Sequence, residues 1–300
     1  MSVWIFLAIA AAAAQTIRSA GQKQLKSQMG DFGASYARFI FALPFAALFL
    51  MGWQQSQNLP LPTLNLEFLF WVSCGALTQI LFTILLITLF SHRNFAAGTA
   101  FSKTEIIQAA LFEALLLGVI VTVQTAFAII IGFVAVLLLS FHKANMGFIK
   151  GLAAIGSKQS LMGLGSGAML GLATVCFRAA TDSLDGDDLV LRAAMTAFIA
   201  TLWQTIVMGA VMLWLAKDEL KSCVKGWRGG WVVGITGAIA TACWFTAFSL
   251  HSVAPVRAVG QIELLITLAV SLFYFKEKIS RTEWLAISLL CLSLLLVILD

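Results

Sequence analysis

The sequence predicts an all-α polytopic membrane protein, with ten transmembrane helices arranged as two inverted five-helix repeats. Hydrophobic residues make up 60% of its 300 residues and charged residues only 11%. In soluble domains about 45–50% of the residues are apolar and about 25% are charged. The apolar residues fall in runs of roughly 20, the length that a helix needs to cross lipid. Charged residues also recur at corresponding positions in the two halves. The chain therefore has no room for a soluble domain.

Polar or charged breaks separate the ten predicted helices, and most of the connections are short. The helices are expected at residues 3–21, 33–53, 68–90, 95–117, 121–141, 161–181, 190–215, 230–250, 254–275 and 281–299. Strands are not expected, because the runs are too long and lack the alternation of a membrane β-barrel. The longest connection, at 142–160, lies near the middle of the chain. We expect this loop to join a first repeat at 1–141 to a second repeat at 161–300.

The two halves share charged positions that are rare inside apolar helices. A shift of 158 residues places Glu105 on Glu263, and a shift of 160 residues places Arg18 on Arg178. Each half has five helices, an odd number, so two tandem copies must have opposite orientations in the membrane. Inverted repeats of this kind are typical of transporters, whose substrate site lies near the midplane between the repeats.

A family resemblance is carried mainly by the last two predicted helices. Between Ala254 and Ile298 the chain has Glu263 in mid-helix, then Phe-Lys-Glu-Lys-Ile-Ser at 275–280, then another apolar helix. This pattern resembles the closing signature of the drug/metabolite transporter superfamily, EamA type. Residues 96–140 resemble its counterpart in the first repeat, and Arg38-Phe39 resembles a pair common in the second helix of the family. The resemblance implies a ten-helix metabolite transporter and says little about the substrate.

The chain departs from this family pattern at three points. Ile106 and Leu264 follow the two mid-helix glutamates, where the family often has a proline. Val119 follows Gly118 at the end of the fourth predicted helix, where a glutamate is common. The proline that would break each of the two helices is therefore absent from this sequence.

Polar side chains on the fourth and ninth predicted helices form the candidate substrate site. Thr99 and Lys103 are four residues apart and share a helix face, and their counterparts Arg257 and Gln261 do the same. We expect these two faces to confront each other and bind the substrate. Their positive charge favours a solute with an anionic group, such as an amino acid, an organic acid or a phosphate ester. In the alternative interpretation, Lys103 and Arg257 extend to the lipid headgroups.

The glutamates at 105 and 263 follow these faces by two residues, which is about 200° around an α-helix. Both are therefore expected to point away from the substrate site. In one hypothesis they form buried ion pairs between helices, with Arg18, Arg38 or Arg178 as partners. In the other they titrate and couple transport to protons, because a low-dielectric environment raises the pKa of a carboxyl group towards neutrality.

Several further residues are expected to serve packing rather than chemistry. Glu113 lies nearer the end of the fourth helix and is expected to be a packing or interfacial group. Gly163, Gly167 and Gly171 are spaced four apart on the sixth helix, which lets a neighbouring helix approach closely. Pro44 is expected to kink the second helix.

A secondary transporter that works by alternating access is the function that the sequence favours. We expect it to be an exporter, coupled to protons or to a counter-substrate. No Walker motif is present to indicate ATP drive. An intramembrane enzyme is a weaker hypothesis: Ser166 between two glycines could be a nucleophile, but the candidate bases His92, His142 and His251 all lie at predicted helix ends. A flippase for a lipid-linked group is the third hypothesis.

No cofactor or metal is expected, because the sequence lacks a Cys/His spacing typical of such sites. The expected partners are a small-molecule substrate and membrane lipids. Nucleic acid is not expected, since the net charge of +5 is spread thinly along the chain. We expect a multi-pass monomer or homodimer in a bacterial-type inner (plasma) membrane.

Two arguments about orientation in the membrane conflict. Lysine and arginine are concentrated in the odd-numbered loops, whereas the even-numbered loops at 54–66 and 182–189 contain neither. Because cytoplasmic loops carry an excess of these residues, this bias places both termini outside. The family resemblance implies that both termini are cytoplasmic. We follow the charge bias, because it belongs to this chain.

Overall fold

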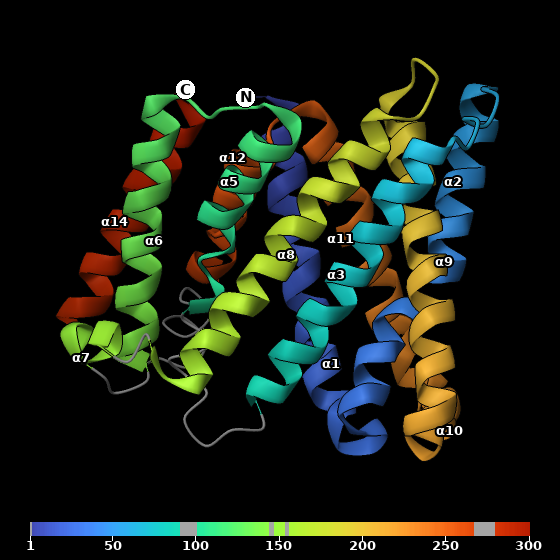
Figure 1. Cartoon of the computed structure of the whole chain (residues 1–300), viewed down its shortest axis with the longest axis horizontal. Helices are drawn as coiled ribbons and strands as arrows, with labels where there is room; N and C mark the ends of the chain where they lie inside the picture. The colour runs from blue at the N-terminus through green and yellow to red at the C-terminus, as the bar shows by residue number, and fades with distance from the viewer. Residues whose placement is uncertain (1, 91–100, 144–146, 154–155, 267–279) are drawn as a thin grey trace. The chain divides into compact units, whose positions relative to one another are not determined.

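The computed structural model describes residues 2–90, 101–143, 147–153, 156–266 and 280–300. Within these ranges the chain forms helices and no strands. They are α1 (Val3–Ile40), α2 (Leu43–Gln57), α3 (Leu66–Phe90), α5 (Glu105–Leu117), α6 (Val123–Lys143), α7 (Phe148–Ala153), α8 (Lys158–Asp182), α9 (Leu189–Leu215), α10 (Lys217–Lys225), α11 (Trp227–Leu250), α12 (Val253–Gly260) and α14 (Arg281–Ile298) (Figure 1). The described ranges contain eight helical segments long and apolar enough to cross a membrane. The predicted all-α, multi-pass class is confirmed.

The number of transmembrane helices stays a prediction. The fourth and ninth predicted helices, at 95–117 and 254–275, extend into residues 91–100 and 267–279, which lie outside the described part of the chain. Their described portions include α5 and α12, which have 13 and 8 residues, and short helical stretches at 101–102 and 262–266. The central connection at 142–160 contains more helix than the expected loop, because α6 continues to Lys143 and Phe148–Ala153 form α7.

The described chain divides into two compact units. The first unit contains Met1–Ile80 and Cys176–His251, and the second contains Leu81–Val175 and Ser252–Asp300. Each unit therefore combines segments from both predicted repeats. The division into repeats at 142–160 stays a prediction.

In the first unit, α1 packs along α11, and α2 packs along α9 (Figure 1). The side chains that join them are apolar and almost completely buried, with Tyr36 from α1, Met208 and Met212 from α9, Cys223 from α10 and Val233 from α11. Their burial fixes the short helix α10 against the longer ones.

A break at Gly30 divides α1 into two helical segments. Gly30 has φ 76° and ψ −177°, a conformation that side chains with a Cβ rarely adopt. The second segment begins beside Glu219 of α10, whose carboxylate accepts hydrogen bonds from the backbone N–H groups of Phe32 at 2.8 Å and Gly33 at 3.0 Å. These N–H groups have no partner inside a helix at its first turn. Glu219 therefore caps the second segment of α1 from another helix.

The kink that Pro44 is expected to introduce into the second predicted helix, at 33–53, is observed as a short turn just before this proline, within one apolar span of Gln24–Gln57. The last segment of α1 ends at Ile40, Phe41 and Ala42 form a turn, and α2 begins at Leu43. Pro44 lies in the first turn of α2, where its missing N–H costs no helical hydrogen bond.

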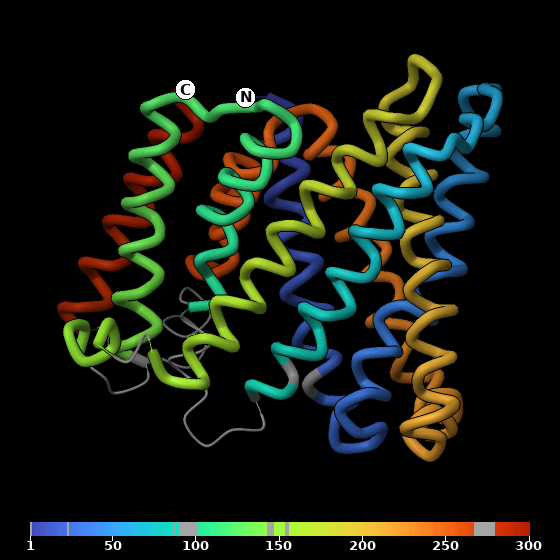
Figure 2. The backbone as a smooth tube through the Cα atoms, in the orientation of Figure 1, coloured from blue at the N-terminus to red at the C-terminus, as the bar shows by residue number. Residues whose placement is uncertain are grey.

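In the second unit, α6 and α14 lie side by side and run in opposite directions (Figure 2). Contacts at both ends set this register. Thr125 donates a hydrogen bond to the carboxylate of Asp300 at 2.5 Å, and Ser280 contacts the Nε2 atom of His142 at 2.9 Å. Between these ends, Ser293 donates to the carbonyl of Ala128 at 2.7 Å.

Candidate functional site

Two turns interrupt the helices that carry the predicted substrate residues. Lys103 and Thr104 form a turn immediately before α5, and Gln261 forms a turn immediately after α12. Thr104 (φ −64°, ψ −9°) and Gln261 (φ −63°, ψ −8°) have nearly the same backbone conformation, close to that of a 3₁₀ turn. Lys103 and Gln261 are the residues that the 158-residue shift superposes. The helices are therefore interrupted at corresponding positions, without proline.

Two ion pairs connect these segments in the second unit. Lys103 Nζ lies 2.9 Å from Glu263 Oε1, and Arg257 Nη2 donates a hydrogen bond to Glu105 Oε1. Glu105 is only 5% exposed and Arg257 only 8%, so each needs the opposite charge of the other. Lys103 also interacts electrostatically with Glu105 and Arg257. We call these four residues the charge cluster.

The helix ends favour this arrangement of charges. Glu105 lies in the first turn of α5 and Arg257 in the last turn of α12. Partial positive charge at a helix N-terminus stabilises an acidic side chain, and partial negative charge at a C-terminus stabilises a basic one. The buried pair is therefore stabilised by the two helix dipoles as well as by its own attraction.

The expectation that the glutamates point away from the substrate site is wrong. Glu263 contacts Lys103 directly, and Glu105 contacts Arg257. The helical-wheel argument assumed two uninterrupted α-helices, but the turns at 103–104 and 261 change the rotation between successive residues, and these side chains are long. Both glutamates form ion pairs between helices, but their described partners are Arg257 and Lys103 and not the expected Arg18, Arg38 or Arg178. The pair of Glu105 and Arg257 is buried, whereas the pair of Lys103 and Glu263 is partly exposed.

The other two predicted substrate residues are Gln261 and Thr99. Gln261 is buried in the second unit, at 4% exposure. Its side-chain oxygen has no hydrogen-bond partner among the described residues, so this oxygen can accept a hydrogen bond from a bound solute. Thr99 lies outside the described residues.

Two glycines of α8 hold the backbone on which Lys103 and Glu105 are placed. A Cβ atom on Gly167 would lie 2.8 Å from the carbonyl oxygen of Ser102, and one on Gly171 would lie 3.0 Å from that of Glu105. The absence of side chains therefore lets α8 contact the start of α5 backbone to backbone. The expected packing role is confirmed for these two glycines.

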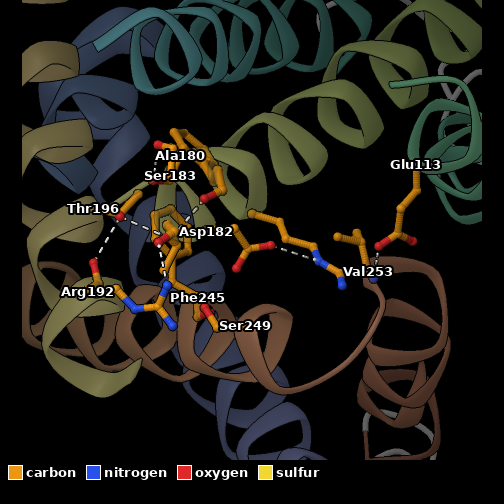
Figure 3. A network of polar contacts seen from close by, with 12 residues as sticks. Glu113, Ala180, Asp182, Ser183, Arg192, Thr196, Phe245, Ser249 and Val253 are labelled. Atoms are coloured by element: carbon orange, nitrogen blue, oxygen red, sulfur yellow. Dashed lines mark hydrogen bonds and ion pairs between the residues drawn. The ribbon is translucent and has the colours of Figure 1, made fainter. Parts of the chain in front are cut away.

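Glu113, which we expected to be a packing or interfacial group, is completely buried in the second unit. Its carboxylate accepts hydrogen bonds from the backbone N–H groups of Val253 at 2.8 Å and Ala254 at 3.4 Å (Figure 3). These groups belong to the first turn of α12, the helix that carries Arg257. Glu113 therefore anchors one end of that helix to α5, and Glu105 contacts Arg257 in its last turn.

The three arginines that were candidate partners for the glutamates lie in the first unit. Arg18 and Arg38 line one cavity together with Gln79, Gln204 and residues of α11. Arg178 Nε lies 3.5 Å from the carboxylate of Asp182, one turn further along α8. These arginines belong to a different compact unit from the charge cluster.

A polar network surrounds Asp182 at the end of α8. The hydroxyl groups of Thr181 and Thr196 are joined by a hydrogen bond of 3.0 Å, and Figure 3 shows Thr196 beside Arg192 and Asp182. Thr196 in turn donates to the carbonyl of Arg192 at 2.9 Å. This network links α8 to α9 within the first unit.

Some residues of these polar regions were missed by sequence reasoning. Gln204 Nε2 donates to Gln79 Oε1 at 2.5 Å, which joins α9 to α3. An uncharged amide inside an apolar helix is visible in the sequence and indicates a polar contact, because a buried amide needs a hydrogen-bond partner. The sequence could not show that these two glutamines are partners, because 125 residues separate them.

Part of the chain matches a known family, and the whole chain matches a known fold. Residues 157–299 match the model of the EamA-like transporter family. No curated protein matches the chain. One solved structure, described only as the crystal structure of a protein, shares 13% identity and a TM-score of 0.71, over 99% of this chain and 96% of that chain. At this identity the similarity shows the fold alone.

Proposed function

We propose that this membrane protein, whose residues 157–299 match the EamA-like transporter family, is a secondary transporter that exports a small polar metabolite. It works by alternating access in a bacterial-type inner membrane. The charge cluster is the observation on which the proposed substrate class rests. Lys103, Arg257 and Gln261 bind the anionic or zwitterionic solute, with Thr99 as a further candidate.

The charge cluster suits a solute that carries opposite charges, such as an amino acid. It contains two cations and two anions, and the contacts between Lys103 and Glu263 and between Arg257 and Glu105 occupy all four. A carboxylate of the solute can replace one glutamate at its cation, and an ammonium group can then pair with the released glutamate. Leaving a buried charge without a partner is costly. Exchange of partners avoids this cost, so the empty and occupied states remain similar in free energy.

The same cluster offers two ways of coupling transport. A proton on Glu105 or Glu263 would neutralise that carboxylate and release its cation for an anionic solute, which links protonation to binding. Alternatively, a counter-substrate occupies the same cations on the return step. Both use the two ion pairs already present.

Uptake of radiolabelled amino acids, organic acids and phosphate esters into proteoliposomes, with and without a pH gradient, tests the proposal. Lys103→Gln combined with Glu263→Gln removes one ion pair without leaving a buried charge, and should abolish transport while the protein stays monodisperse. Arg281→Gln, at an exposed position of α14, is the matched control and should transport normally. Full activity of the double variant would contradict the site assignment.

The coupling mode needs a separate measurement. If a glutamate carries the proton, Glu263→Gln or Glu105→Gln should lose gradient-driven uptake and keep exchange of internal for external solute. Full pH-gradient dependence in both variants would reject proton coupling through the charge cluster. Loss of exchange as well, with folded protein, would show that the carboxylate binds the solute.

A further inference from the structure

The short helix α10 joins two membrane-spanning helices of the first unit. The apolar span of α9 ends at Leu215, and the apolar span of α11 begins at Trp227. The helix α10 lies between these two residues in the chain, at one end of α9 (Figure 1). Because both neighbouring spans leave the hydrocarbon region at these ends, α10 lies at the level of the lipid headgroups.

The two faces of α10 differ in their chemistry. On one face, Cys223 is buried and Glu219 caps the second segment of α1. The other face exposes Lys217, Lys221 and Lys225. These lysines are spaced four residues apart, so they lie in one row along the helix. Basic segments next to a transmembrane helix are attracted to the headgroups of anionic lipids.

The start of α11 adds a fourth cation and two aromatic rings to this surface. Arg228 is exposed, and its guanidinium carbon lies 5.7 Å from the centroid of the Trp227 ring. The rings of Trp227 and Trp231 are both exposed, and they contact each other edge to face with their centroids 6.3 Å apart. Tryptophan is enriched where a membrane protein passes from hydrocarbon to water. These rings therefore agree with a position of α10 at the membrane interface.

The acidic residues of α10 do not neutralise the row of lysines. The carboxylate of Glu219 is directed at α1, where it accepts two backbone hydrogen bonds. Asp218 Oδ1 lies 3.3 Å from Lys221 Nζ, but both side chains are exposed, and an exposed pair of this kind is weak. None of the other three basic side chains forms an ion pair with a described residue. The surface therefore keeps an excess of positive charge.

Apolar side chains lie beside the basic row in the chain. Trp214 and Leu215, the last two residues of α9, are 87% and 81% exposed, and Val224 is exposed between two of the lysines. A phospholipid carries a charged headgroup on apolar acyl chains, so it needs basic and apolar surface next to each other. A soluble phosphate needs only the basic surface. The combination therefore favours a lipid as the occupant.

We propose that α10 and the start of α11 form a binding site for an anionic phospholipid. Lys217, Lys221, Lys225 and Arg228 contact its phosphate and headgroup, and the exposed residues at 214–215 contact its acyl chains. The bound lipid also stabilises the first unit, because a ligand that binds only the folded state shifts the folding equilibrium towards it. The break in α1 gains from this binding, since the opposite face of α10 supplies the cap of Glu219.

Lipid binding to the purified full chain in detergent tests this inference. Phosphatidylglycerol, which is anionic, should bind by native mass spectrometry and raise the melting temperature, whereas phosphatidylcholine, which has no net charge, should do both much less. The triple variant Lys217→Gln, Lys221→Gln, Lys225→Gln should weaken phosphatidylglycerol binding by about tenfold or more, since each basic residue strengthens binding to an anionic surface by roughly fivefold. Arginine at the same three positions should preserve binding. All three lysines are exposed, so without lipid both variants should melt like the unmodified protein.

The matched control is the triple variant Lys150→Gln, Lys158→Gln, Arg281→Gln, which removes the same charge from exposed positions of the second unit. It should bind phosphatidylglycerol like the unmodified protein. An equal loss of binding in the α10 variant and in this control would overturn the site, because the response would then follow total charge. Equal binding of the two lipids, or unchanged affinity in the α10 variant, would also overturn it. Inorganic phosphate that stabilised the protein as much as the lipid does would show a site for a free oxyanion instead.

Discussion

The carboxylate of Glu113 accepts a hydrogen bond from the backbone N–H of Val253 at 2.8 Å, which attaches the first turn of α12 to α5. Without this acceptor, buried N–H groups would lose a partner. We predict that Glu113→Ala lowers the free energy of unfolding by about 1–3 kcal/mol. Glu113→Gln should cost less, because its amide oxygen can still accept a bond. Chemical denaturation in detergent measures both.

Leu115→Ala is the control for this prediction, since Leu115 is an exposed position of the same helix. It should change the free energy of unfolding much less than Glu113→Ala does. If both substitutions lowered the free energy of unfolding equally, the hydrogen bonds that Glu113 accepts from α12 would add nothing to the effect of removing a side chain.

The close approach of α8 to α5 gives a second prediction. Added methyl groups at Gly167 and Gly171 would meet backbone oxygens at 2.8 and 3.0 Å. Gly167→Ala and Gly171→Ala should each therefore cost about 1–3 kcal/mol, as overpacking does, and should reduce transport by displacing Lys103 and Glu105. On the same helix, a methyl group on Gly165 meets only Leu85, at 3.8 Å. Gly165→Ala should therefore be tolerated. If it lowered the melting temperature as much as Gly167→Ala does, the close packing of α8 on α5 would not explain the loss of stability.

The break in α1 gives a third prediction. Gly30 has positive φ, and a Cβ there would collide with the carboxyl group of Glu219. Gly30→Ala should cost more than the roughly 1–3 kcal/mol of positive-φ backbone strain alone, because it also displaces the cap. Gly186 has φ 106°, but a methyl group added there would have no atom within 4 Å. Gly186→Ala should therefore lower the free energy of unfolding only by the cost of the backbone strain. Equal losses of stability in the two variants would argue against a role for Glu219.

The thiol of Cys223 on α10 gives a fourth prediction. Burial raises its pKa from 9.0 to about 12. At pH 8 its thiolate fraction is therefore about a thousandfold smaller than that of an exposed thiol, and the thiolate is the reactive form. A protein with Cys223 as its only cysteine should react with a maleimide very slowly when folded and rapidly in denaturant. Lys221→Cys, exposed on the same helix, should react rapidly without denaturant.

The same pKa shift has a consequence for stability. Between pH 9 and about pH 12 the unfolded thiol loses its proton while the folded one keeps it. The stability that Cys223 contributes is therefore complete below pH 9 and decreases as the pH rises through this range. Cys223→Ala should show a smaller decrease over the same range, and parallel pH profiles would refute the assignment.

Orientation in the membrane gives the fifth prediction. The lysine and arginine bias places both termini outside, so a reporter that fluoresces only in the cytoplasm should stay dark when it is fused after Asp300. A bright fusion would support the cytoplasmic termini that the family resemblance implies. A second fusion in the segment at 217–226, which carries Lys217, Lys221 and Lys225, should give the opposite signal.

The sequence alone determined the membrane class and the positions of most helices. The apolar runs predicted at 121–141, 190–215 and 281–299 are observed as α6, α9 and α14 with boundaries within a few residues. This succeeded because a helix that crosses lipid must be long, apolar and internally hydrogen-bonded, and these requirements are local. The residues of the charge cluster were also identified in this way, because charge inside an apolar run is rare.

Only the tertiary structure decided which of these residues are partners. Lys103 is paired with Glu263 at a separation of 160 residues, and the helical wheel predicted that they point apart, because the turns at 103–104 and 261 have no proline to reveal them. The sequence also could not show that Glu113 is completely buried, or that Arg18 and Arg38 line the same cavity. Sequence periodicity describes one helix at a time, whereas ion pairs, caps and cavities depend on how distant helices pack.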